Sequence, residues 1–224
     1  MGSQPLNSSL METPTHIRRQ RIVGGNVALD LLNTQNGPAG MEAEDDALRD
    51  YGDLIAWGRY VGVLSDTDAD RLLRRSRADP ESARIVFERT IETRTYLYHL
   101  FSDIARGRSP AASDIGRLQR DEADAVAHAT LVKAGRGYHW SWAADAANDD
   151  LARPLWPIIH AALTLVTEGP LDRVKGCASC RFLFVDESKN RSRRWCSMED
   201  CGAEDKMRNY VARRSMARAS RASE

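Results

Sequence analysis

The chain has 224 residues, of which 42% are hydrophobic and 29% charged. This composition is typical of a globular protein, and the length allows one sizeable core plus a small second domain. The longest nearly apolar run, from Leu155 to Val166, is interrupted by Pro157 and His160 and is too short to cross a bilayer. Since the N-terminus also lacks an apolar signal core, we expect a cytoplasmic protein without a membrane span.

The formal net charge of +0 hides an uneven distribution. Residues 173–221 hold 13 Lys and Arg against 6 Asp and Glu, a net charge of +7, so the rest of the chain carries −7. A basic tail on an acidic body suits a protein whose tail meets a polyanion, because Lys and Arg that neutralise phosphates dominate nucleic-acid affinity. A solvated basic helix without a nucleic-acid partner is the alternative.

The N-terminal part of the chain predicts a leader followed by a strand. Residues 1–21 are polar and are expected to be a disordered leader. Residues 27–32 form a short apolar run that favours a strand, or a strand running into a helix, ended by turn-forming residues. Asp30 and Asn33 are candidates for binding a small ligand, because polar residues that leave a strand lie at the surface. A helix cap and a buried hydrogen bond are the alternative for this pair.

The rest of the body is expected to be mainly helical. Apolar residues recur at helical spacing, and Ser65 with Asp68 forms a variant of the capping box. The expected helices are residues 48–61, 65–79, 80–106, a shorter one after Pro110, and 153–168. Residues 130–142 instead alternate around a glycine turn, which predicts a β-hairpin. The predicted fold class is therefore α+β, a mainly helical body with a short N-terminal strand and a β-hairpin.

All four cysteines lie close together near the C-terminus. Cys177 and Cys180 form a CxxC pair, and Cys196 and Cys201 form a second pair, with fifteen residues between the two pairs. Zinc prefers four soft ligands in a tetrahedron, and a cytoplasmic protein has little use for disulfides. The spacing predicts one structural Zn²⁺, ahead of a disulfide pair or an iron–sulfur cluster. Four thiolates leave no open position that could activate water.

The finger around these cysteines is expected to be a zinc-ribbon-like hairpin with a basic helix. A strand over residues 181–185, a polar turn and a return segment over 192–195 make up the hairpin. After Cys201 a helix is expected, with Met207, Tyr210, Val211 and Ala217 on its inner face.

Basic side chains of the polar turn and the C-terminal helix are the candidates for binding phosphates. They are Lys189, Arg191, Arg193, Arg194, Lys206, Arg208, Arg213 and Arg214. An ion pair of Arg193 or Arg194 with Asp186 or Glu187 across the hairpin is the alternative.

Enzymatic activity is not expected. The chain has no GxGxxG, P-loop, GxSxG or paired metal-binding histidine motif, and no cysteine is spare to act as a nucleophile. We therefore assign no catalytic residue.

The run CASCRFLFVDESKNRSRRWCSMEDCG, residues 177–202, resembles the CGNR zinc-finger module of bacterial transcription regulators. In that family the module follows a domain called ABATE, to which VALDLLNT and YGDLIAWGRYVGVL are similar. The resemblance covers residues 22–214. It implies a stress-induced regulator in which residues 22–171 form a sensor-like domain and residues 172–224 form a zinc finger that binds double-stranded DNA. It also implies that the four cysteines are the metal ligands.

One departure from the family signature bears on DNA binding. The final Asn and Arg of the CGNR signature fall on Ala203 and Glu204, which changes the local charge by two units. Two alternatives to DNA binding therefore stay open: a zinc-stabilised module for protein interaction, and a thiol-based redox sensor. The resemblance is also compatible with a small-molecule effector, whose chemistry it does not identify. A homodimer would suit DNA binding, since two half-sites increase specificity.

Overall fold

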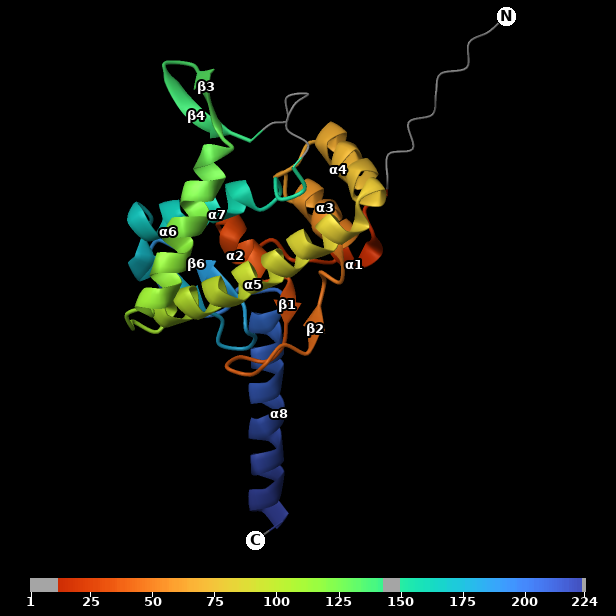
Figure 1. Cartoon of the computed structure of the whole chain (residues 1–224). Coiled ribbons are helices and arrows are strands. Elements are labelled where there is room, and N and C mark those ends of the chain that lie inside the picture. Colours follow the sequence, from red (N-terminus) through yellow and green to blue (C-terminus); the bar gives the residue numbers. More distant parts are fainter. Residues whose placement is uncertain (1–11, 143–149, 223–224) are drawn as a thin grey trace, which may run out of the picture.

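The computed structural model describes residues 12–142 and 150–222 (Figure 1). Its elements in chain order are α1 (Thr15–Arg18), α2 (Val27–Leu32), β1 (Gln35–Asn36), β2 (Asp45–Asp46), α3 (Tyr51–Tyr60), α4 (Asp66–Ala78), α5 (Pro80–Ala105), α6 (Ala112–Ala127), β3 (Thr130–Ala134), β4 (Gly137–Ser141), α7 (Trp156–Thr167), the 3-10 turn η1 (Leu171–Arg173), β5 (Val174–Gly176), β6 (Leu183–Val185) and α8 (Cys201–Ala222). Within the described residues the strands form three antiparallel pairs, β1–β2, β3–β4 and β5–β6. The predicted α+β class is confirmed.

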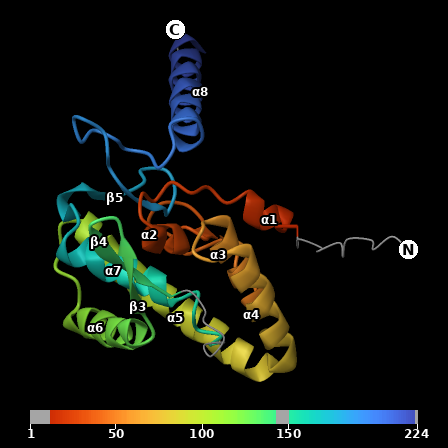
Figure 2. The same cartoon turned by 90° about the horizontal axis from the view of Figure 1, so that it is seen from above.

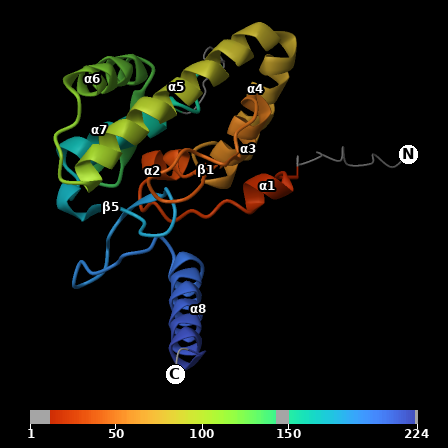
Figure 3. The ribbon, with the colours of Figure 1, turned by 90° about the horizontal axis from the view of Figure 1, so that it is seen from below.

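The long helix α5 organises the body core and runs across the body in Figures 2 and 3. Its inner side buries Leu97, Leu100 and Phe101 completely, at the three- and four-residue spacing that the sequence predicts. Trp57 of α3 and Ile158 of α7 complete the same cluster. Packing of α5 against α2 and α3 from the N-terminal part and against β5 from the C-terminal part contributes to one continuous core.

The predicted strand over residues 27–32 is wrong, because these residues form helix α2. Asn26 caps this helix: its side chain accepts a hydrogen bond from the Ala28 amide at 2.8 Å. A short continuous apolar run looks the same in a buried strand and in a buried helix, so periodicity could not separate them. The chain enters strand β1 only after α2 has ended.

The fold also begins before Ile22, so the prediction of a leader fails for residues 12–21. Ile17 in α1 is fully buried in the body core. Beside it, His16 Nε2 lies 2.8 Å from Asp53 Oδ1 of α3. One apolar residue among polar ones gives no periodic signal, which explains why the sequence did not indicate this helix. Residues 1–11 lie outside the described residues.

The short pair β1–β2 was not predicted, whereas the β3–β4 hairpin and the helices from α3 to α7 agree with the prediction. In the β3–β4 hairpin, Leu131 pairs with Trp140, and Gly135 in the turn has a φ of 58°, where glycine is favoured. The Ser65 side chain caps α4 by accepting from the Asp68 amide at 3.2 Å. Among the described residues, no helix is long and apolar enough to cross a membrane.

The hairpin predicted inside the finger has a different partner strand. β6 pairs with β5, which precedes the first cysteine, through Val174↔Val185 and Gly176↔Leu183. Residues 192–195 form no strand. The three residues of β5 are too few to show an alternation, so no pattern indicated this strand.

Candidate metal centre and nucleic-acid interface

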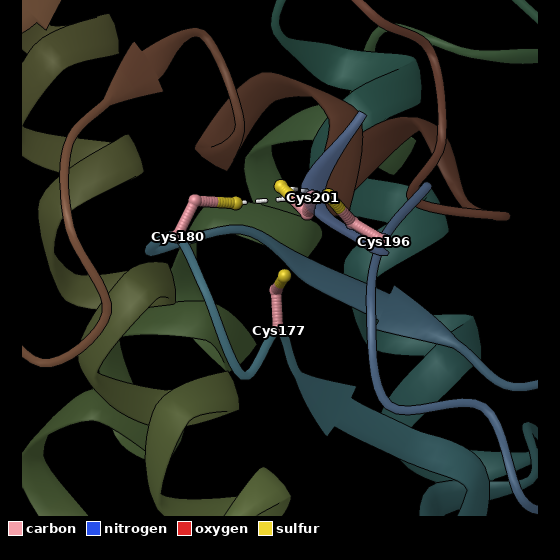
Figure 4. Close-up of side chains that lie close together, drawn as sticks. All are labelled: Cys177, Cys180, Cys196 and Cys201. Atoms are coloured by element: carbon pink, nitrogen blue, oxygen red, sulfur yellow. Dashed lines mark hydrogen bonds between the residues drawn. The ribbon is translucent and has the colours of Figure 1, made fainter. Parts of the chain in front are cut away.

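The four cysteine side chains converge on one point from three separate segments (Figure 4). Their Sγ atoms all lie within 4.8 Å of one another, with 3.6 Å between Cys180 and Cys196 and 3.7 Å between Cys196 and Cys201. Zn–S bonds of about 2.3 Å would place the sulfurs of a tetrahedron about 3.8 Å apart. The sulfur positions therefore fit a single four-coordinate Zn²⁺.

Local backbone structure sets the first ligand pair. Cys177 follows β5 directly, and its amide donates to the Phe182 carbonyl at 2.8 Å, which closes the CxxC turn. The Ser179 amide points at Cys177 Sγ at 3.4 Å. A backbone amide that donates to a sulfur stabilises the thiolate form, which is the form that binds metal. Cys201 supplies the last ligand as the first residue of α8.

All four cysteine side chains are buried. Hydrogen bonding to Cys177 raises the pKa of Cys180 to about 12, whereas hydrogen bonds from Cys180 and Cys196 lower the pKa of Cys177. Four thiolates at this spacing repel one another, and a bound dication allows all of them to stay deprotonated. The centre thus holds one structural Zn²⁺, whose role is to cross-link the knuckle, the loop before Cys196 and the start of α8.

Arg21 is a residue of this centre that the sequence did not indicate. Its Nη1 lies 3.8 Å from Cys201 Sγ and 3.2 Å from Asp200 Oδ2, and its guanidinium stacks over the Phe182 ring at 5.0 Å. A cation beside the sulfurs offsets the negative charge of four thiolates around one dication. The segment before Ile22 therefore supports the metal centre.

Strand β6 joins the finger to the body through its two faces. Leu183 and Val185 pack in the body core, whereas Phe182 and Phe184 pack with the cysteines. This alternation follows from the two-residue period of a strand. Arg193 covers the finger side: its guanidinium stacks over Phe184 at 4.7 Å.

The loop between β6 and Cys196 is organised by one buried carboxylate. Asp186 accepts hydrogen bonds from Lys175 Nζ at 2.6 Å, the Ser188 amide at 2.9 Å and the Arg193 amide at 3.0 Å. Burial opposes ionisation of Asp186, but these hydrogen bonds outweigh it and lower its pKa. Lys175, and not the side chain of Arg193 or Arg194, is therefore the ion-pair partner of Asp186.

The predicted phosphate-binding side chains divide into two groups. Three are engaged within the protein: Arg193 donates to the carbonyls of Trp195 and Cys196, Arg191 pairs with Asp172, and Arg208 donates to Ser179 Oγ at 2.6 Å. The others are exposed and form no ion pair with the described residues; they are Lys189, Arg194, Lys206, Arg213 and Arg214. This second group leaves cationic surface on the loop and along α8.

Helix α8 has no inner face in the structure, contrary to the prediction. Met207, Tyr210 and Val211 are 63%, 50% and 57% exposed, and the helix projects away from the body in Figures 1 to 3. Side chains from Met216 onward, including predicted Ala217, lie outside the described residues. An amphipathic pattern marks a face that can be covered, but it does not specify what covers it.

The predicted ligand candidates Asp30 and Asn33 are not at the surface. Both are buried. Asp30 Oδ1 accepts from the Gly24 amide at 2.7 Å, and burial raises its pKa. Asn33 donates to the Leu183 carbonyl and accepts from the Leu183 amide, each at 2.9 Å. Asn33 thus fastens β6 to the body.

Two models of known protein families match the chain. The ABATE family model, described as "Putative stress-induced transcription regulator", matches residues 25–169. The chain belongs to the ABATE family. The CGNR zinc-finger model matches residues 173–214, a range that contains all four zinc ligands. No curated protein matches the chain. The ABATE body therefore carries a CGNR zinc finger that binds one structural zinc ion.

The two signature positions at which this ABATE protein differs from CGNR lie in the first turn of α8. Ala203 and Glu204 are exposed there, and the Glu204 amide donates to the Asp200 carbonyl at 2.9 Å. An acidic side chain in the first turn is favourable for the helix dipole. The substitution is thus compatible with the helix, but it places a negative charge beside the basic surface.

Proposed function

We propose that this ABATE protein is a transcription regulator that binds double-stranded DNA through its zinc finger and α8. The family matches and the zinc centre support a zinc-binding regulator. That this regulator binds DNA is our further proposal, and it is based on one observation. Helix α8 starts at a zinc ligand and projects from the body, with Lys206, Arg213 and Arg214 exposed.

A projecting helix of this kind fits the major groove, which is wide enough to admit one α-helix. Lys206 and Arg213 are seven residues apart, so they lie on the same side of α8. Arg214 lies close to that side. On the finger, Lys189 and Arg194 add exposed cations, so phosphate contacts would form at the helix and at the loop.

The test is fluorescence anisotropy of the zinc-loaded protein with labelled duplex DNA across a salt series. For Arg213→Ala with Arg214→Ala, we expect the slope of log K against log salt to shrink by about 2, since each lost phosphate contact removes about 0.9. The matched control is Lys133→Ala with Arg136→Ala, which removes two exposed cations from the β3–β4 hairpin. An unchanged slope in the first variant, or an equal loss in the control, would contradict α8 as the DNA-binding element.

A second candidate function is a zinc-stabilised surface for a protein partner. The exposed apolar residues Met207, Tyr210 and Val211 on α8 favour it, because amphipathic helices commonly dock in apolar grooves. Ala203→Asn with Glu204→Arg separates the two functions. A large gain in DNA affinity in this variant would show that Ala203 and Glu204 weaken the DNA-binding surface of the unaltered protein. If neither the variant nor the unaltered protein binds DNA at low salt, a protein partner is favoured.

A further inference from the structure

A cavity lies between α5 and the zinc finger, beside the metal centre. It has a volume of about 250 Å³. Its walls come from the end of α5, from the turn at Ala39 and Gly40, and from the knuckle between β5 and β6, including the zinc ligands Cys177 and Cys180. The body and the finger thus line this partly open cavity together.

One wall of the cavity carries an arginine that forms no ion pair with a carboxylate of the described residues. Arg181 is only 9% exposed, and among the described residues no carboxylate pairs with it. Its Nε is buried without a hydrogen-bond acceptor. Buried arginines are rare unless they are paired, because removing a charge from water is costly. The described residues supply no carboxylate acceptor for the guanidinium, so its donors remain available to an external oxyanion.

The position of this guanidinium is fixed by its neighbour on α5. Arg181 stacks over the Tyr98 ring at 4.4 Å, and Tyr98 Oη donates to the Arg181 carbonyl at 3.2 Å. A stacked, planar guanidinium presents its remaining donors in a fixed fork that matches carboxylate and phosphate oxygens. Arg181 is thus already oriented for an oxyanion.

Two further groups in the cavity wall suit the same ligand. The Ser102 hydroxyl is buried in the wall and has no partner among the described residues. Arg106, exposed at the end of α5, adds a second cation. Among the described residues Arg181 forms no hydrogen bond to any of the four sulfurs, whereas Arg21 lies within hydrogen-bond distance of Cys201 Sγ.

We propose that this cavity binds a small oxyanion, a carboxylate or phosphate group on a compact metabolite, with Arg181 as the main contact and Ser102 as a second donor. The burial of Arg181 favours a small molecule over the phosphate of a duplex, which approaches an open surface. Because the cavity is shared by α5 and the knuckle that holds Cys177 and Cys180, its occupant touches both parts of the regulator. The site does not depend on DNA binding by α8.

The experiment is isothermal titration calorimetry of the zinc-loaded full chain with inorganic phosphate and, separately, with acetate at constant ionic strength. We expect saturable binding of at least one of the two anions. Arg181→Gln should weaken it about tenfold or more, since a charge-assisted hydrogen bond is lost. Ser102→Ala should weaken it about threefold, the loss of one neutral donor. The matched control is Arg108→Gln, which removes a cation near the same end of α5 but outside the cavity wall.

Several results would overturn the proposal. One is that neither anion shows saturable binding. Another is that Arg181→Gln and the unaltered protein bind the anion with equal affinity. Zinc stoichiometry and helical circular dichroism check that each variant folds. If Arg181→Gln loses zinc, Ser102→Ala decides, and unchanged affinity in that variant also rejects the site. If Arg181→Gln lowers DNA affinity as much as anion affinity, the occupant is a DNA phosphate and the small-molecule assignment is wrong.

Discussion

The ABATE body and the CGNR finger are stabilised by different means. The body buries a large apolar cluster in which Trp57, Leu97, Phe101 and Trp156 are almost completely excluded from solvent. The finger's own cluster consists of four cysteines and two phenylalanines, with Val23 and Trp195 packed against it. So small an apolar cluster cannot fold the segment by itself, and the metal supplies most of its stability.

The two regions are nevertheless not independent, because β6 contributes to both clusters. One face of this strand is part of the body core, and the other face packs on the cysteines. A boundary drawn along the sequence therefore does not separate two cores. The comparison predicts that loss of metal damages the finger, whereas β6 stays attached to the body.

Removal of zinc should have the largest effect. Structural zinc contributes on the order of 10 kcal/mol in finger peptides, so a chelator should unfold residues 177–182 and 186–201 locally. Hydrogen exchange should show loss of protection in these two segments, while β6, α5 and α7 stay protected. Cys196→Ser should give the same pattern without chelator. Unfolding of the entire chain would contradict the idea that the body is stabilised by its own core.

A mutation that leaves a cavity in the body core should destabilise the body without loss of zinc. Leu97→Ala is expected to lower the free energy of unfolding by about 2–5 kcal/mol, because Leu97 is fully buried in α5. Zinc stoichiometry should stay at one. Ile85→Ala, at an exposed position of the same helix, is the control and should change stability by about 0.5 kcal/mol or less. Loss of zinc in Leu97→Ala would show that the finger needs an intact body core.

The link between the regions can be weakened at Asn33. Asn33→Ala leaves the amide and the carbonyl of Leu183 buried without their partner, which should cost about 1–3 kcal/mol. Hydrogen exchange of β6 should become faster, while zinc remains bound. Asn36→Ala, at an exposed position of β1, is the matched control. Unchanged exchange of β6 in Asn33→Ala would show that apolar contacts alone hold the strand.

Local patterns in the sequence were sufficient for the features that depend on neighbouring residues. The spacing of Cys177, Cys180, Cys196 and Cys201 indicated the zinc centre, because metal geometry restricts where ligands can lie along a chain. Periodicity likewise predicted α5, and glycine placement predicted the β3–β4 hairpin. Each of these signals is contained within a short window.

Contacts between distant segments left no comparable signal. Arg21 lies 180 residues from Cys201, and Asn33 lies 150 residues from Leu183. A single arginine or asparagine in a polar stretch looks the same whether it faces solvent or a buried partner. Arg181 is an instructive case, since its sequence neighbours place it beside a zinc ligand, but only the fold shows that its charge is buried and unpaired.

The smallest expected effect on stability comes from a polar contact within the body, between residues far from the zinc ligands in the sequence. Arg153 Nη2 lies 2.5 Å from Asp68 Oδ2, and this hydrogen bond lowers the pKa of Asp68. Asp68→Asn should cost about 1 kcal/mol at pH 7, because an amide oxygen can still accept from Arg153. The pKa of Asp68 in the folded protein lies below its value of about 3.9 in the unfolded chain. The stability that the charged carboxylate contributes is therefore fully present above the unfolded pKa, and it is lost as the pH falls through the folded pKa.

Urea unfolding of Asp68→Asn and the unaltered protein at pH 7 and at successively lower pH measures this difference. The gap between the two midpoints should narrow as the pH falls below 4, because the protonated carboxyl becomes neutral like the amide. Residues far from the cysteines carry this contact, so body unfolding monitored at α4 should show the gap even when the finger has lost its zinc. A gap that stays constant across the pH range would assign the stability of this pair to packing and hydrogen-bond geometry, and the charge of Asp68 would then add nothing to the body.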